Sequence, residues 1–344
     1  MEELLGNLVE ATGAPGHEEG VREALRSRLK ADKVREDNFG NLVAEKGSGD
    51  RTLMLIAHMD SIGLSVRRID EEGFLRVSRL GGIYSMAAIN QRFNVHASEG
   101  EELSGVAGHE PVHVQESDEK QQLPELEELF IDIGADSREE ALDMGVRKGD
   151  FVTYDAEPRK LGNGYFSAPG IDDRAGCAAV LEAFNSFEGD FRLVAVFSAQ
   201  EEVGRKGAKT SSFSVDPDVA LAVDTCMAGD VPNVDVRDTE DATGDGVGIV
   251  MSQSGGRGLL TPKSVREWLL ETAEQNGHSY FRSLYDGGAT DAATVNVSRS
   301  GVPAGSLGIP TRYVHSPVET VKISDVEEAE EFLESAFESF SDFF

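Results

Sequence analysis

The chain has 344 residues and a formal net charge of −31, with 63 Asp and Glu against 32 Lys and Arg. A field of this sign repels nucleic acid and anionic membrane surfaces, so we exclude both as partners. Hydrophobic residues make up 39% of the chain, which is enough for a real core. The length suits one large α/β domain, with or without a smaller insertion.

The acidic residues are spread along the whole chain, and Lys is scarcer than Arg. We expect this composition of a halophile, whose proteins work in a salt-rich cytoplasm, with an ordinary acidic mesophile protein as the alternative. The N-terminal stretch MEELLGNLVE has no basic flank, and no stretch of the chain is long and apolar enough to span a membrane. We therefore expect a soluble, cytoplasmic protein.

The first part of the chain predicts helices, a hairpin and a buried strand. Helices are expected over residues 2–11 and 17–29, and two short strands over 34–45. The apolar run 51–57 is typical of a strand buried on both faces, and it ends in His58-Met59-Asp60. His58 and Asp60 are two residues apart at a strand end, so their side chains can point to the same side.

The region from residue 65 to residue 160 differs from its surroundings. Its short alternating segments predict β-structure. The predicted strands cover residues 74–80, 93–96, 111–115, 129–133 and 151–154, with a charged stretch at 116–128 and a helix at 137–145. We predict a small β-rich domain over 65–160, inserted into a catalytic domain made of residues 1–64 and 161–344.

The alternation of helices and strands returns after residue 160, as in a wound sheet. A turn with Asp172 leads into a helix predicted over residues 176–184. Three further strands, each followed by polar residues, are predicted at 193–197, 218–223 and 302–309, and two helices at 263–276 and 326–344. The predicted fold class is α/β, a wound mixed sheet flanked by helices with the inserted β-rich domain.

Each of these strands ends at or near a histidine or a carboxylate. In open α/β sheets, ligands bind at the carboxyl ends of the strands, so these side chains are expected to meet. The candidate ligands are His58, Asp172, Glu202, Asp224 and His315. Imidazole and carboxylate without thiolate suit zinc, cobalt or manganese. We favour Asp172 over Asp173 as the group that bridges two metals.

Two metals about 3.5–4 Å apart lower the pKa of a shared water and stabilise developing oxyanion charge. Glu201 would then act as the general base and pass the proton to the leaving amine. Asp60 would orient the His58 imidazole through its other ring nitrogen. We interpret Cys177 and Cys226 as buried core thiols, although each lies near a proposed ligand in the sequence.

Taken together, these motifs resemble the tetrahedral (TET) aminopeptidases, which belong with the glutamyl aminopeptidase-like dinuclear metallopeptidases. The resemblance rests on HMD at 58–60, DDRAG at 172–176, QEEVG at 200–204, Asp224 and YVHSP at 313–317. Segments 108–113 and 131–135 are similar to that family's dimerisation domain, and the turn 287–291 is similar to one near its substrate.

The resemblance implies a complete site and an assembly. One metal would be held by His58, Asp172 and Asp224, and the second by Asp172, Glu202 and His315, with zinc or cobalt as the metals. It further implies a homododecameric tetrahedral shell built from dimers, with active sites that face an interior cavity and admit short peptides with a free N-terminus.

The function predicted from the sequence is therefore a metal-dependent aminopeptidase in which two metals activate a water and Glu201 is the base. A carboxypeptidase or amide deacetylase of the related dinuclear hydrolases is the alternative, and a cluster of Arg beside the motifs would favour it. A non-catalytic acidic metal-binding protein would need a missing base or ligand. Glycoside hydrolysis is disfavoured, because adjacent glutamates at one strand end cannot flank a glycosidic bond.

Overall fold

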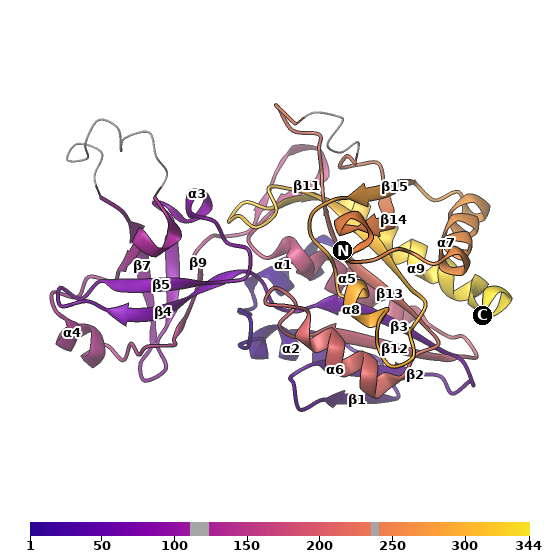
Figure 1. Ribbon diagram of the computed structural model, residues 1–344, viewed down its shortest axis with the longest axis horizontal. Helices are drawn as coiled ribbons and strands as arrows, with labels where there is room; N and C mark the ends of the chain where they lie inside the picture. Colours follow the sequence, from indigo (N-terminus) through magenta and orange to yellow (C-terminus); the bar gives the residue numbers. More distant parts are fainter. Residues whose placement is uncertain (111–123, 235–240) are drawn as a thin grey trace.

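The computed structural model describes residues 1–110, 124–234 and 241–344. In this part of the chain, a large mixed sheet with helices on both faces lies beside a small closed barrel (Figure 1). The predicted α/β class with a separate small β domain is confirmed. The strand predicted at 111–115 and most of the charged stretch at 116–128 lie outside the described residues. Among the described helices, none is both long and apolar enough to cross a membrane.

The large sheet is parallel at its centre and mostly antiparallel toward its edges. Its strands, in order across the sheet, are β1 (Lys33–Glu36), β2 (Leu42–Lys46), β12 (Arg192–Ser198), β3 (Thr52–His58), β13 (Val219–Met227), β16 (Ala304–Arg312), β17 (Thr320–Lys322), β11 (Tyr165–Ser167) and β10 (Arg159–Lys160). Strand β14 (Val247–Gln253) pairs with β16 and with β15 (Tyr280–Tyr285). Because β12, β3, β13 and β16 run parallel, their carboxyl ends lie at one edge.

Helices cover both faces of this sheet. One face carries α1 (Glu2–Glu10), α2 (Glu19–Arg26), α5 (Ile171–Ser186), α7 (Lys263–Asn276) and α9 (Ile323–Phe343), and the other carries α6 (Lys206–Val215) and α8 (Ala292–Val295). Strand β3 is buried on both sides because alternate residues face opposite cores. Leu53 and Leu55 face the α5 side, whereas Met54 and Ile56 face the α6 side.

The predicted helices are observed with shifted ends. Helix α5 starts at Ile171 rather than at residue 176, so Asp172 lies in its first turn, where the backbone is not yet helical. The C-terminal helix starts at Ile323. Trp268 packs as a core residue, fully buried, and its indole N–H donates to Ser339 Oγ. Helix α6 was not predicted, because its Ser- and Thr-rich sequence has no clear apolar periodicity.

The barrel has its own core. Its strands are β4 (Gly63–Ile69), β5 (Leu75–Leu80), β8 (Phe130–Asp132), β7 (Glu102–Gly108), β6 (Arg92–His96) and β9 (Phe151–Tyr154), accompanied by α3 (Ser85–Ala88) and α4 (Arg138–Asp143). Its buried cluster, which includes Val66 and Phe93, shares no residue with the clusters of the large sheet. The first strand, β4, pairs with the last, β9, so the chain enters and leaves the barrel at adjacent points.

Candidate metal centre

The predicted site residues meet at the carboxyl ends of the parallel strands. His58 is the last residue of β3 and lies opposite Ser198, the last residue of β12. Glu201 and Glu202 follow β12, and Asp224 lies in β13. The remaining two predicted ligands come from the first turn of α5 and from the loop after β16.

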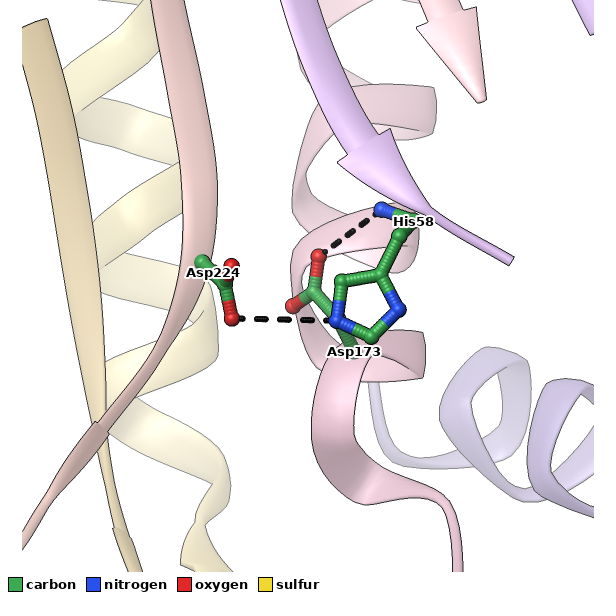
Figure 2. A group of neighbouring side chains, drawn as sticks. All are labelled: His58, Asp173 and Asp224. Atoms are coloured by element: carbon green, nitrogen blue, oxygen red, sulfur yellow. Dashed lines mark hydrogen bonds and ion pairs between the residues drawn. The ribbon is translucent and has the colours of Figure 1, made fainter. Parts of the chain in front are cut away.

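The His58 imidazole faces two carboxylates. Its Nε2 lies 3.3 Å from Asp172 Oδ1 and 3.9 Å from Asp224 Oδ1. Figure 2 shows the ring pointing toward Asp224, while the main-chain nitrogen of His58 faces Asp173, to which it donates at 3.2 Å. Both the side chain and the main chain of His58 are thereby fixed by acidic groups.

His315 completes the arrangement from the opposite side of Asp172. Its Nε2 lies 3.5 Å from Asp172 Oδ2 and 3.5 Å from Glu202 Oε1. Asp172 therefore stands between the two histidines and directs one carboxylate oxygen toward each.

Asp173, the next residue, is placed differently. Its Oδ2 accepts the main-chain N–H of His58, and its Oδ1 accepts that of Gly176 at 3.0 Å. Both oxygens are thus engaged in joining the end of β3 to the start of α5. Within the described residues, two groups have ligand atoms that all lie within 4.8 Å of one another: His58 with Asp173 and Asp224, and His58 with Asp172 and Glu202.

The donor atoms fit a divalent metal ion. Asp172 Oδ1 and Glu202 Oε1 are buried and have no hydrogen-bond partner. Buried carboxylate oxygens normally have such partners or coordinate a cation. Together with imidazole nitrogens, they are the ligand types that zinc and cobalt accept.

Burial and mutual repulsion dominate the electrostatics of the site. Burial raises the pKa of Glu201 and Asp224 well above the usual range, and it raises that of Glu202 in the same direction. Burial alone would lower the pKa of His315, but contacts with Asp172 and Glu202 outweigh it and raise the value to about 11. Bound cations would offset this accumulation of negative charge.

Asp60 is buried on the side of the His58 ring that lies away from Asp172. The Nδ1 of His58 lies 2.9 Å from the main-chain oxygen of Asp60 and 3.7 Å from its carboxylate. That carboxylate accepts the main-chain N–H groups of Glu201 at 2.9 Å and Glu202 at 3.1 Å. Asp60 therefore contacts the ring nitrogen that faces away from Asp172 and also fixes the turn that carries both glutamates.

Glu319 was not among the site residues predicted from the sequence. It is 1% exposed, and its carboxylate accepts the main-chain N–H of Asp172 at 3.0 Å and that of His315 at 2.8 Å. Burial raises its pKa to about 8. A carboxylate within the otherwise uncharged stretch PVETV, four residues after His315, was the signal that could have revealed it.

Asp291 makes a contact near the site that was not predicted from the sequence. It is 2% exposed, and its Oδ2 accepts a hydrogen bond from Ser198 Oγ at 2.5 Å, while its Oδ1 has no hydrogen-bond partner. The sequence placed only the turn 287–291 near the substrate. Asp291 in fact contacts the end of β12, directly before the turn with Glu201.

The two cysteines are free and buried, as expected for core thiols. The Cys177 thiol donates to the main-chain oxygen of His58 at 3.1 Å. Cys226 packs against Gly308 on the neighbouring strand, where an added Cβ would lie 2.9 Å from its sulfur. Neither thiol belongs to the ligand groups found among the described residues.

A wound α/β sheet with imidazoles and carboxylates gathered at its strand ends defines a metal-dependent hydrolase. Residues 40–332 match the model of the M42 glutamyl aminopeptidase family, and the chain belongs to this family. It is therefore a metallo-aminopeptidase, a hydrolase that acts on peptide bonds.

Relatives match over nearly the whole chain. The lysyl aminopeptidase of Pyrococcus furiosus is 34% identical over 94% of this chain and 93% of its own. An aminopeptidase structure from the archaeon Desulfurococcus kamchatkensis is 37% identical, covers 98% of this chain and 94% of its own, and superimposes with a TM-score of 0.94. The TET1 peptidase of Pyrococcus horikoshii, which can assemble into a tetrahedron or a large octahedral shell, is 30% identical with a TM-score of 0.87 over 97% of this chain and 98% of its own.

Proposed function

We propose that this enzyme removes N-terminal residues from short peptides with a free N-terminus, with Glu201 as the general base. One observation carries the proposal. Glu201 lies in the same turn as Glu202 with its side chain 11% exposed, but among the described residues Glu202 contacts His315 at 3.5 Å, whereas Glu201 has Arg205 Nη1 at 4.0 Å. A carboxylate held beside a metal centre without coordinating it is placed to move a proton.

We assign one metal to His58, Asp172 and Asp224, and the other to Asp172, Glu202 and His315. The support for Asp172 as the shared ligand is its contact with both histidines, at 3.3 Å and 3.5 Å through different oxygens. The engagement of both Asp173 oxygens with main-chain N–H groups argues against Asp173 in that role. When bound, two zinc or cobalt ions would lower the pKa of a shared water and polarise the peptide carbonyl.

The protein groups then act in sequence. Glu201 takes a proton from the attacking water and delivers it to the amine that leaves as the peptide bond breaks. Burial raises its pKa, which brings a carboxylate closer to the value at which it both accepts and releases a proton near neutral pH. Asp60 keeps this carboxylate in place through the main-chain N–H of Glu201.

We further propose a homododecamer built from dimers, with the barrel as the dimerisation domain, in the cytoplasm of a halophile. The assembly is supported by the likeness to the shell-forming Pyrococcus horikoshii peptidase. The salt requirement is supported by the net charge of −31, whose self-repulsion salt screens. Size-exclusion chromatography before and after dialysis into low salt tests it, since an intact and active dodecamer in low salt would contradict it.

The decisive experiment measures hydrolysis of a panel of aminoacyl chromogenic amides in high salt with zinc or cobalt. Glu201→Gln is compared with Glu327→Gln, which changes an exposed glutamate of α9. We expect Glu201→Gln to lower kcat by about 100- to 10,000-fold while metal content per chain stays at the wild-type value. Glu327→Gln should behave as wild type.

Three outcomes would count against the proposal. Turnover of blocked or C-terminal substrates, without turnover of free-amine substrates, would favour the deacetylase or carboxypeptidase alternative. Loss of metal in Glu201→Gln would make Glu201 a ligand rather than the base. Full activity of Glu201→Gln would mean that another residue is the base.

A further inference from the structure

A cation lies beside the proposed base. Arg205 Nη1 is 4.0 Å from Glu201 Oε1, and no other cation lies within ion-pairing distance of Glu201 in the described ranges 1–110, 124–234 and 241–344. The side chain of Arg205 is 34% exposed and that of Glu201 is 11% exposed, so solvent screens the pair only in part. Asp60 fixes the main chain of Glu201, whereas Arg205 contacts the carboxylate itself.

The same guanidinium nitrogen is bonded to a second segment. Arg205 Nη1 donates to the main-chain oxygen of Ala289 at 3.0 Å, in the turn 287–291. The Nε of Arg205 is buried and has no hydrogen-bond partner. Within the described part of the chain, the two contacts of Nη1 are therefore the polar contacts that hold this guanidinium in place.

The turn around Ala289 is itself fixed. Gln253, the last residue of β14, accepts the main-chain N–H of Thr290 at 3.1 Å. The Asp291 carboxylate accepts the hydroxyl of Ser198, the last residue of β12, at 2.5 Å. Two strands of the large sheet thus hold the turn, which gives the guanidinium a firm support.

The backbone at Arg205 is also unusual. Its φ is 54°, in the left-handed region that residues with a side chain rarely adopt, and it caps the start of α6. Its main-chain N–H donates to the main-chain oxygen of Glu201 at 2.7 Å, which closes the turn between the two residues. Asp291 occupies the same position before α8, and α6 and α8 lie side by side (Figure 1). Non-glycine residues in this conformation cluster at functional sites.

We propose that Arg205 is a positioning residue for the reaction, and that it fixes the Glu201 carboxylate against the turn 287–291. The inference rests on the proposed function, because it takes Glu201 as the base. A glutamate side chain has several rotatable torsions that a main-chain hydrogen bond does not fix, so a contact at the carboxylate narrows its range. Small displacements of a catalytic group lower the rate strongly, so Arg205 should affect kcat rather than KM.

Kinetics of Arg205→Gln and Arg205→Lys in the metal-loaded, full-length protein test this role. Arg205→Gln should lower kcat about tenfold on leucyl, lysyl and glutamyl amides alike, with KM within about threefold of wild type. Metal content per chain should not change. Arg205→Lys, which keeps the charge, should recover part of the loss. Lys209→Gln is the matched control, because it removes the same charge from an exposed position of α6.

A double-mutant cycle separates positioning from a general structural effect. Glu201→Asp shortens the proposed base by one methylene group and so alters its distance from Arg205. If Arg205 acts through Glu201, adding Arg205→Gln to Glu201→Asp should lower kcat by less than about threefold. Independent effects would instead multiply, and the full loss of about tenfold would appear in both backgrounds.

Three results would overturn the proposal. Wild-type kinetics of Arg205→Gln would show that the base does not need this contact. A loss confined to glutamyl amides, or a higher KM with unchanged kcat, would mean that Arg205 binds the substrate. Effects that multiply in the cycle would mean that Arg205 does not act through Glu201. Failure of the proposed function is distinguishable, since it would appear in the wild type or as full activity of Glu201→Gln.

Discussion

The carboxylate of Asp60 accepts the main-chain N–H of Glu201 at 2.9 Å and thereby joins the strand that ends in His58 to the turn that carries the proposed base. The second oxygen of the same carboxylate accepts the N–H of Glu202 at 3.1 Å. One fully buried side chain thus sets the position of a proposed base and a proposed ligand together.

Asp60→Asn should lower kcat more than it lowers metal content. An amide replaces one acceptor oxygen by an NH₂ group that would face a main-chain N–H, which costs about 1–3 kcal/mol of folding stability. We expect a loss of about 10- to 100-fold in kcat with nearly unchanged metal per chain. Parallel kinetics and metal analysis measure this, with the exposed Glu338→Gln as control. Unchanged kcat would show that the turn does not need this carboxylate.

Glu319→Gln should lower metal affinity more than it lowers kcat. The reason is that Glu319 accepts the main-chain N–H groups of Asp172 and His315 and does not hold the turn that carries the base. We expect metal affinity to fall about 10- to 100-fold. Competition with a chelator measures it, and saturating metal should restore most of kcat. A fall in kcat that saturating metal does not restore would contradict this role. Glu327→Gln, an exposed change on α9, serves as the matched control.

Removal of metal should destabilise the folded chain. The carboxylates of Glu201, Glu202 and Asp224 are largely shielded from solvent, which raises their pKa, and cations offset their repulsion. Metal present at about 100 to 1,000 times its Kd contributes about 3–4 kcal/mol. Differential scanning calorimetry with and without EDTA should therefore show a lower Tm after chelation. Asp172→Asn, which weakens both ligand sets, should show a much smaller shift with EDTA. An unchanged wild-type Tm after verified loss of metal would contradict the prediction.

Glu330 on α9 should make stability fall as the pH rises. Burial, together with Glu182 and Glu334, raises its pKa from 4.5 to about 7. The folded state therefore holds this proton more tightly than the unfolded state. This contribution to stability is fully present below about pH 4.5 and is lost as the pH rises through about 7.

Glu330→Gln should consequently be more stable than wild type at pH 8, by about 1 kcal/mol after allowance for solvent screening, and similar to it at pH 5. Urea unfolding at both pH values at low ionic strength measures the difference. Glu338→Gln, an exposed change on the same helix, should show no such pH dependence. An equal effect of Glu330→Gln on stability at both pH values would contradict the role assigned to the raised pKa of Glu330.

The strands and the residues that follow them could be predicted because two local signals coincide. The run at 51–57 is apolar throughout, as a strand between two helix layers requires, and it ends at His58. The same holds for the strands before Glu201 and Asp224. Parallel strands bring their carboxyl ends to one edge, so contacts between residues more than a hundred positions apart followed from topology alone.

The remaining parts depend on contacts that no local pattern encodes. Glu319 and Asp291 act by accepting hydrogen bonds from Asp172 and Ser198, which are distant in sequence. Arg174 stands in a motif with Asp172, but the lack of a hydrogen-bond partner for its Nε and Nη1 is visible only in the folded chain. Helix α5 starts earlier than predicted because Ile171 packs into the core although a turn precedes it.

The pairing of the barrel's first and last strands has a thermodynamic consequence. The barrel has its own core, and the chain enters and leaves it through two neighbouring strands. It can therefore unfold as a cooperative unit while the rest of the chain stays folded. Heating would then proceed in two steps. Since every proposed metal ligand lies outside the barrel strands, the catalytic half would keep its ligands through the first melting step even as contacts made by the barrel are lost.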